Sequence, residues 1–350
     1  MKTDIVKTMQ HRLESVPRVP LPELPTPCVP MERLGAHFGH RGLFVKNDGL
    51  SGKEYGGNKI RKLEFLLGEA LEQNRKSVIT YGAAGSNHAL ATAVCCRQLG
   101  LKAVSVLAPQ PTSEKVCRNL LMGHAVGADL HHFSHYNEFQ EATRNLTERY
   151  VEIDGIAPYI IPAGGTNATG ALGFVNAALE MAEQITPDVI YLAMGTGGTL
   201  AGLLVGLRMA GLSTRVEAVR VVDPAFRNRT HIRRLCDEIC TLLGQPPIVS
   251  DPDIAIRNEF LGQDYGIPTA EGREAVRLFE ALEGIRLDNT YTGKAAAALI
   301  HDLRNGSLNG RSVLFWNTLN AIDFSGRIED IDFRSLPADF HAYFEGFERY

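Results

Sequence analysis

The sequence predicts an α/β fold of two lobes, each with a largely parallel, twisted sheet flanked by helices. Three observations predict it. The chain has 350 residues, enough for one large domain or two ordinary ones. Strand-like apolar segments alternate with helical segments along most of the chain. A strand, a glycine-rich turn and a helix also follow one another twice, at residues 77–101 and 188–211. We therefore expect parallel sheets covered on both faces and a ligand in the cleft between the lobes.

Apolar periodicity and turn residues predict the elements in chain order. An amphipathic helix begins near residue 58, because apolar residues recur at three- and four-residue steps from Ile60 to Leu71. Thr or Glu is expected to cap the helix at 269–285. Besides the two repeated units, the predicted strands are 102–109, 159–165, 215–223 and 312–320, and the other predicted helices are 113–128, 170–185 and 269–285.

Composition excludes several classes of protein. Apolar residues make up 44% of the chain and charged residues 22%, so the chain can bury a core. The net charge of -4 predicts no nucleic-acid or anionic-membrane partner. No apolar run approaches the length of a membrane span, and the first 15 residues lack the apolar region of a secretory signal.

The cysteines and histidines favour a reduced, metal-free protein. None of the six cysteines forms a C-x-x-C pair, and Cys236 and Cys240 have ordinary spacing for one face of a helix. Reduced thiols in a cytoplasmic protein are therefore expected. His131, His132 and His135 lie close in sequence but lack a partner motif such as H-E-x-x-H, so no metal site is predicted.

The segment "AMGTGGTLAG", residues 193–202, has the features of a phosphate-binding loop. A strand runs into glycines whose backbone N–H groups can face one anion, and the following helix start adds its dipole. The predicted loop residues are Gly195, Thr196, Gly197, Gly198 and Thr199.

Other interpretations of this loop stay open. A dinucleotide fingerprint is weakened by Leu200 in place of the third glycine, although Glu217 lies near the distance expected for a ribose ligand. A Walker loop starting at Gly52 would need a lysine where Asn58 stands. A glycine-rich turn without a ligand is the remaining alternative.

Two further segments, "GSNHALATAV" and "GGNKIRKLEF", place reactive or hydrogen-bonding residues at predicted helix starts. Ser86 and Asn87 are either simple N-caps or donors that face a ligand. Lys59 is either a solvated lysine or a reactive amine. The helix N-terminus and the neighbouring Arg61 and Lys62 would lower its pKa and favour the neutral, nucleophilic form. A neutral lysine and a separate phosphate loop are the two anchor points that pyridoxal phosphate requires.

Six segments occur in the order found in one enzyme family: "GGNKIRKLEF", "GSNHALATA", "IPAGGTNATGALGF", "GTGGTLAGLLVGL", "YGIPTAEG" and "TYTGKAAAALI". Together they resemble the pyridoxal-phosphate enzymes that include D-cysteine desulfhydrase and 1-aminocyclopropane-1-carboxylate deaminase. The resemblance covers about Leu21 to Asn320 and implies the fold-type II architecture of the tryptophan synthase β chain. It also implies a homodimer, with a smaller lobe, residues 61–171, inserted into a larger lobe of residues 1–60 and 172–350.

The resemblance implies a role for each matching residue. Lys59 matches the lysine that binds the cofactor covalently, and Asn87 the residue that hydrogen-bonds the pyridine 3-oxygen. Ser86 matches the serine beside the substrate carboxylate. The remaining matches are Gly195 to Thr199 for the cofactor phosphate, Tyr265 and Tyr291 beside the substrate, and Thr318 facing the pyridine nitrogen.

Three departures from the family pattern concern the substrate. Relatives acting on the cyclopropane substrate have a glutamate near the pyridine nitrogen where this chain has Thr292, so cyclopropane opening is disfavoured. Gly85 replaces the usual glutamine before the Ser-Asn pair. The segment 317–320, "NTLN", replaces the usual His-Thr-Gly-Gly.

The resemblance implies a lyase that removes an α-proton through Lys59 and eliminates a β-substituent such as thiolate, as D-cysteine desulfhydrase does. A β-replacement synthase or a lyase acting on a non-standard amino acid is the alternative. A chain that binds the cofactor without turnover is the interpretation from a different class, and a nucleotide-binding oxidoreductase is a further rival.

Overall fold

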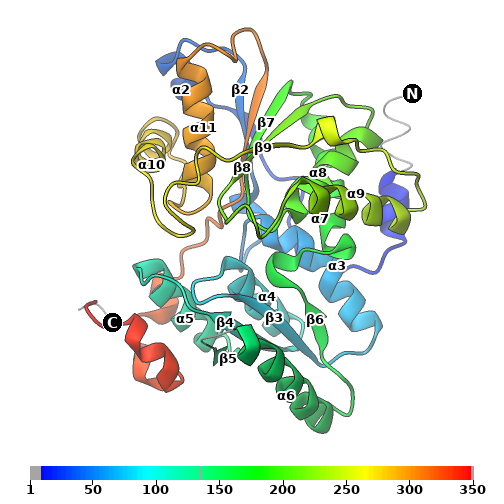
Figure 1. Ribbon diagram of the computed structural model, residues 1–350, viewed down its shortest axis with the longest axis vertical. Helices are drawn as coiled ribbons and strands as arrows, with labels where there is room; N and C mark the ends of the chain where they lie inside the picture. Colours follow the sequence, from blue (N-terminus) through cyan, green and yellow to red (C-terminus); the bar gives the residue numbers. More distant parts are fainter. Residues whose placement is uncertain (1–8, 134–135, 348–350) are drawn as a thin grey trace.

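The computed structural model describes residues 9–133 and 136–347. Within them the chain forms two sheets with helices on both faces (Figure 1). The strands are β1 Cys28–Pro30, β2 Leu43–Asn47, β3 Ser77–Ala83, β4 Lys102–Ala108, β5 Asp129–His132, β6 Tyr159–Ile161, β7 Val189–Met194, β8 Arg215–Arg220, β9 Ala255–Arg257 and β10 Val313–Asn317. The helices are α2 Glu32–His37, α3 Asn58–Glu72, α4 Asn87–Gln98, α5 Glu114–Ala125, α6 Tyr136–Asp154, α7 Ala168–Gln184, α8 Gly198–Met209, α9 Arg229–Leu242, α10 Ala270–Glu283, α11 Thr292–Arg304 and α12 Ser325–Ile328.

The first sheet has six strands in the order β1-β2-β10-β7-β8-β9, and all its pairs are parallel except β1 with β2. Successive residues of β7 face opposite cores, as the two-residue repeat of a strand requires. Ile190 and Leu192 pack with α7, α8 and α9, whereas Val189 and Tyr191 pack with α10 and α11. The strands are therefore apolar on both faces, as in sheets covered by helices on each side.

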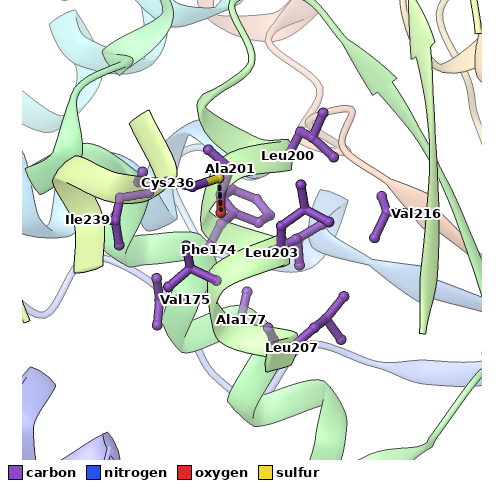
Figure 2. Close-up of a cluster of buried hydrophobic side chains, with 14 of the residues drawn as sticks. Phe174, Val175, Ala177, Leu200, Ala201, Leu203, Leu207, Val216, Cys236 and Ile239 are labelled. Atoms are coloured by element: carbon purple, nitrogen blue, oxygen red, sulfur yellow. Dashed lines mark hydrogen bonds between the residues drawn. The ribbon is translucent and has the colours of Figure 1, made fainter. Parts of the chain in front are cut away.

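Helices α7, α8 and α9 form one of these cores (Figure 2). Phe174 of α7, Leu203 of α8 and Ile239 of α9 are fully buried against one another. A Cβ atom at Gly202 would lie 2.3 Å from the carbonyl oxygen of Ala171, so only glycine permits this close approach of α8 to α7. The packing fixes the start of α8, where the predicted phosphate loop lies.

The second sheet has four parallel strands in the order β5-β4-β3-β6. All four strands lie within residues 77–161, which come between β2 and β7 of the first sheet in the sequence. The final segment, from Phe324 to Phe344, returns to pack on the core beside α5, as Figure 1 shows. The predicted lobe limits fall inside α3 and α7 and stay a prediction.

The structure contains all the elements that the sequence predicted, including the Thr269 cap on α10, whose side chain accepts from the N–H of Gly272. The periodicity missed the strands β1, β2, β5 and β9, which are three to five residues long and too short for a clear pattern. It also missed the short helices α2 and α12 and the longer helices α6 and α11. None of the helices in the described ranges combines the length and the apolar character of a membrane span.

Candidate active site

A cavity of about 730 Å³ lies where strand ends of the two sheets meet. The segments after β7 and β10 line it from the first sheet, and the segments after β3 and β6 line it from the second. The predicted site residues that line it are Lys59, Ser86, Asn87, Gly195, Thr196, Gly197, Thr199, Tyr265, Tyr291, Thr292 and Thr318. Gly198 lies directly behind this lining, at the first position of α8.

Lys59 lies in the first turn of α3 with a half-buried side chain. Its amine makes no hydrogen bond or ion pair with any described residue. Burial, and then the positive charge of Lys115, lower the pKa of Lys59 to about 8. At pH 7 about a tenth of this amine is therefore neutral, far more than for a lysine with the ordinary pKa, and the neutral form is the one that a nucleophile or base requires.

The cause of this lowered pKa differs in part from the prediction. Arg61 points away from the cavity into a buried ion network, where it contacts Asp48 at 2.8 Å and Glu180 at 2.9 Å. Its charge is compensated there. Lys115, which lies 56 positions further along the chain, is the charge that acts on Lys59.

Lys62 is a second buried amine at the phosphate loop, and the sequence did not single it out as a ligand. Its Nζ donates to the carbonyl of Gly164 at 3.0 Å. A Cβ at Gly198 would lie 2.8 Å from this Nζ and 2.9 Å from Oγ1 of Thr166. Burial, and then the charge of Lys59, lower the pKa of Lys62 well below its ordinary value. The predicted phosphate loop therefore brings together backbone N–H groups, a buried amine and hydroxyl groups, which are donors that can bind a phosphate.

The loop hydroxyls are held by neighbouring segments. Thr196 Oγ1 lies 2.6 Å from Oγ1 of Thr166, and Thr199 Oγ1 accepts from Asn58 Nδ2 at 3.1 Å. Because Asn58 adjoins Lys59, this contact ties the phosphate loop directly to the helix that carries the reactive amine.

Gly56 and Gly57 have a packing role at the start of α3. A Cβ at Gly56 would lie 2.0 Å from the carbonyl oxygen of Gly49. Gly57 has a positive φ of 86°, and its Cβ would meet the carbonyl oxygen of Thr318 at 2.8 Å. The two glycines allow the start of α3 to pack against other backbone, and they do not line the cavity.

Ser86 and Asn87 begin α4 at the cavity wall. Ser86 caps the helix, since its Oγ accepts from the N–H of Ala89 at 3.2 Å. The Oδ1 of Asn87 accepts from Nδ2 of Asn119 at 3.1 Å. This contact orients the amide so that its N–H group is the free end, which suits a donor to a ligand oxygen.

Gly85 departs from the family pattern for a packing reason. Its N–H donates to Oε1 of Gln110 at 2.9 Å, and its carbonyl accepts from Asn119 at 2.9 Å. A Cβ at this position would lie 2.9 Å from Cγ2 of Val116. A side chain at position 85 would therefore require Val116 of α5 to shift.

The hydroxyl groups of Tyr265 and Tyr291 lie 2.9 Å apart at the cavity, with their rings edge to face. Burial, followed by the proximity of Tyr265 and Asp288, raises the pKa of Tyr291 well above its ordinary value. Tyr291 therefore stays protonated and can donate a proton or a hydrogen bond.

Thr292 is accompanied by a carboxylate that the sequence did not single out. Asp288 Oδ1 accepts from the N–H of Thr292 at 2.8 Å and from its hydroxyl at 3.0 Å. Asp288 lines the cavity. Burial would raise the pKa of Asp288, but Lys115 and hydrogen bonds from Thr292 outweigh burial and lower it, so the carboxylate is ionised.

The segment 317–320 also has a defined structure. Leu319 lines the cavity, and Asn320 Oδ1 accepts from the N–H of Gly56 at 2.7 Å. Asn317 Nδ2 donates to Oδ1 of Asn47 at 3.2 Å. The two asparagines hold the strand ends and the start of α3, whereas the leucine gives the cavity an apolar surface.

The rival interpretations find little support in the geometry. Glu217 contacts Arg215 at 2.5 Å and is absent from the cavity lining, so it is not placed as a ribose ligand. His131 pairs with Asp129 at 3.0 Å. His135 lies outside the described residues, and the described ranges contain no group of three His, Cys, Asp or Glu side chains that could hold a metal.

These features define a class of protein. The chain belongs to the pyridoxal-phosphate-dependent enzymes, a family that it matches over residues 19–318. The D-cysteine desulfhydrase of Yersinia enterocolitica is 37% identical over 310 residues, which cover 85% of this chain and 91% of the relative. The D-cysteine desulfhydrase of Salmonella choleraesuis is 35% identical over 320 residues, which cover 88% and 95%.

Solved structures confirm the fold-type II architecture. The crystal structure of an ACC deaminase homologue superposes with a TM-score of 0.80 at 33% identity and covers 91% of this chain and 97% of its own. Threonine deaminase isoform 2 from Solanum lycopersicum has a TM-score of 0.62 at 15% identity, covering 92% and 86%, and shows the shared fold alone.

The residues present fit pyridoxal phosphate. Both ring nitrogens of the buried His88, which lines the cavity, lack a hydrogen-bond partner among the described residues, and the amine of Lys59 is likewise unpaired. The phosphate donors lie at the start of α8, beside Lys62. The unpaired amine suits the aldehyde of this cofactor, and the hydrogen-bond donors at the start of α8 suit its phosphate.

Proposed function

We propose that the chain is a lyase of the D-cysteine desulfhydrase type, which converts a small β-substituted amino acid and water into a keto acid, ammonia and the released thiol. The observation that supports it most strongly is that the unpaired, half-buried amine of Lys59 lies in the same cavity as the hydrogen-bonded hydroxyl groups of Tyr265 and Tyr291. The curated relatives of this name extend over most of the chain.

In this proposal, each residue has a task set by its position. Lys59 holds the cofactor covalently and, when freed by the substrate, takes the α-proton as general base. Bound pyridoxal phosphate supplies an electron-accepting ring that stabilises negative charge at the α-carbon. Lys62, Thr196 and Thr199 bind the phosphate, together with the backbone of Gly195, Gly197 and Gly198.

Proton supply to the leaving group falls to the tyrosine pair. As the carbon–sulfur bond breaks, its electron pair moves to sulfur, and Tyr265 or Tyr291 donates a proton to the thiolate. Ser86 binds the substrate carboxylate, and Asn87 donates to the 3-oxygen of the cofactor. Thr318, and Thr292 with its hydrogen bond to Asp288, would face the pyridine nitrogen of the bound cofactor. A hydroxyl group at position 292, where relatives acting on the cyclopropane substrate have a glutamate, would favour elimination of a good leaving group over cyclopropane opening.

The departures from the family pattern do not suggest a chain without turnover. Gly85 fits closely against Val116, and Asn320 accepts a hydrogen bond from the N–H of Gly56, so both positions contribute to the site's structure. A β-replacement synthase uses the same first steps and differs only in a nucleophile that captures the product.

We further propose a cytoplasmic homodimer, for which the family resemblance and the free state of the six cysteines are the support.

The test is a panel of D- and L-amino acids with β-leaving groups, together with the cyclopropane substrate, assayed for keto acid, ammonia and sulfide. We expect yellow protein, sulfide release from cysteine and covalent trapping of the cofactor on Lys59 by borohydride. Added nucleophiles distinguish replacement from elimination. Protein that stays colourless with added pyridoxal phosphate would refute the proposal. Light scattering of the purified protein measures its oligomeric state.

A further inference from the structure

One ion pair crosses between the two sheets beside the cavity. Lys115 lies in the first turn of α5, on the second sheet, and Asp288 precedes α11, on the first (Figure 1). Lys115 Nζ lies 3.1 Å from Asp288 Oδ2, and the two side chains are only 23% and 10% exposed. A pair so removed from water is costly to form, so its geometry must be held by the structure around it.

The same carboxylate holds the turn that carries Tyr291. Tyr291 is the N-cap residue of α11 but provides no side-chain cap. Asp288 Oδ1 replaces that cap, because it accepts from the N–H groups of Tyr291 at 3.0 Å and Thr292 at 2.8 Å. Lys115 also contacts Tyr291 directly, with its Nζ 5.5 Å from the ring centroid.

We propose that Lys115 is a positioning residue: it ties α5 to the Asp288–Thr292 turn and thereby holds Tyr291, and the Tyr265–Tyr291 hydroxyl pair, in the cavity wall. The proposal rests on the proposed function, in which that pair donates the proton to the leaving group. Lys115 itself does not line the cavity. It acts through Asp288 and through the face of the Tyr291 ring.

A second consequence follows from the charge of Lys115, which favours the neutral form of Lys59 and helps to lower its pKa to about 8. Removal of that charge raises the pH at which Lys59 titrates. The other titratable groups on this cavity are Lys62, Tyr81, His88, Asp223, Asp264, Tyr265, Asp288 and Tyr291. Lys115 also lowers the pKa of Asp288, so a shift of the Lys59 midpoint in a Lys115 variant reports on the Lys115–Asp288 pair.

The test compares Lys115→Met with Lys115→Arg in the enzyme loaded with pyridoxal phosphate. A small displacement of a group that acts in catalysis costs about ten- to a hundredfold in rate. We expect Lys115→Met to lower kcat by that factor with a much smaller change in KM, and Lys115→Arg to restore most of it. Lys53→Met is the matched control, because Lys53 pairs with Glu23 at 2.9 Å on the exposed surface.

A second readout uses cofactor-free protein and does not depend on activity. The pH dependence of Lys59 modification by an amine-selective reagent, followed by mass spectrometry, gives its titration midpoint. We expect a higher midpoint in Lys115→Met and the parent value in Lys115→Arg and Lys53→Met. If no amino acid is turned over, the proposed function fails while this readout still tests the charge of Lys115. Parent values of both kcat and midpoint in Lys115→Met would overturn the proposal.

Asp288→Asn provides an independent variant in case Lys115→Met does not fold. It keeps an acceptor oxygen for the α11 cap but removes the charge that Lys115 meets. Because both residues act through one contact, the double variant should be no slower than the slower single variant. Effects on kcat that multiply would show that Lys115 acts independently of Asp288 and would contradict the proposal.

Discussion

The buried charge network beneath Lys59 leads to a sharp prediction about stability. Glu180 of α7 accepts hydrogen bonds from Arg61 and Lys46, two fully buried cations, and from the N–H of Thr26 at 3.0 Å. Asp48 accepts from Arg61 and, at 2.8 Å, from Nε1 of Trp316. Two cations and two anions therefore compensate one another, and only the Glu180 side chain, at 11% exposure, has any access to water.

Replacement of Glu180 by glutamine keeps an acceptor oxygen but leaves one buried positive charge uncompensated. Breaking such a pair costs about 3–5 kcal/mol of the free energy of unfolding. Because glutamine keeps an acceptor, we expect a loss of about 3 kcal/mol. With the urea dependence of a chain of this size, the unfolding midpoint should fall by roughly 1 M. Trp316 is the only tryptophan, so its fluorescence reports on this network directly.

The pH dependence of the effect has a defined sign. Burial would raise the pKa of Glu180, but hydrogen bonds and charge from Arg61 and Lys46 outweigh burial and lower it. Its stabilising contribution is therefore present above the unfolded value, about 4.3, and is lost as pH falls through the lower folded value. The difference between parent and Glu180→Gln should shrink below about pH 4.

A matched control lies one turn further along α7. Glu183 is exposed and accepts from Gln10 at 3.3 Å, so Glu183→Gln should change stability by less than about 0.5 kcal/mol. If Glu180→Gln unfolds at the same urea concentration as the parent at neutral pH, the network does not stabilise the fold and this reasoning is wrong.

Two further predictions concern the cofactor site. In cofactor-free protein, a Lys59 pKa of about 8 makes about half of its amine neutral at pH 8, so it should react about a hundredfold faster than a lysine with the ordinary pKa near 10.4. A modification midpoint near 10 would contradict this. Gly198→Ala should weaken pyridoxal-phosphate binding measured by absorbance titration, because its Cβ would lie 2.8 Å from Lys62 Nζ. Gly326→Ala, with no neighbour within 4 Å, should bind the cofactor as the parent does.

Predictions from sequence succeeded where a local pattern carries the signal. The apolar repeat of α3 and the glycines before α8 are patterns within a few residues of the chain, and both helices are present in the structure. The start of α11 was missed because its cap comes from Asp288 and not from Tyr291. The sequence shows that Gly85 and Asn320 differ from the family pattern, but not that they contact Val116 and Gly56.

The sequence by itself determined the alternation of strands and helices, the positions of Lys59 and the predicted phosphate loop, and the family. Each depends on short-range patterns or on ordered motifs. Only the tertiary structure decided which charges act at the site. Arg61, two positions from Lys59, is neutralised by Glu180, whereas the distant Lys115 acts on Lys59. Electrostatic influence depends on distance in space and on burial, and neither follows from separation along the chain.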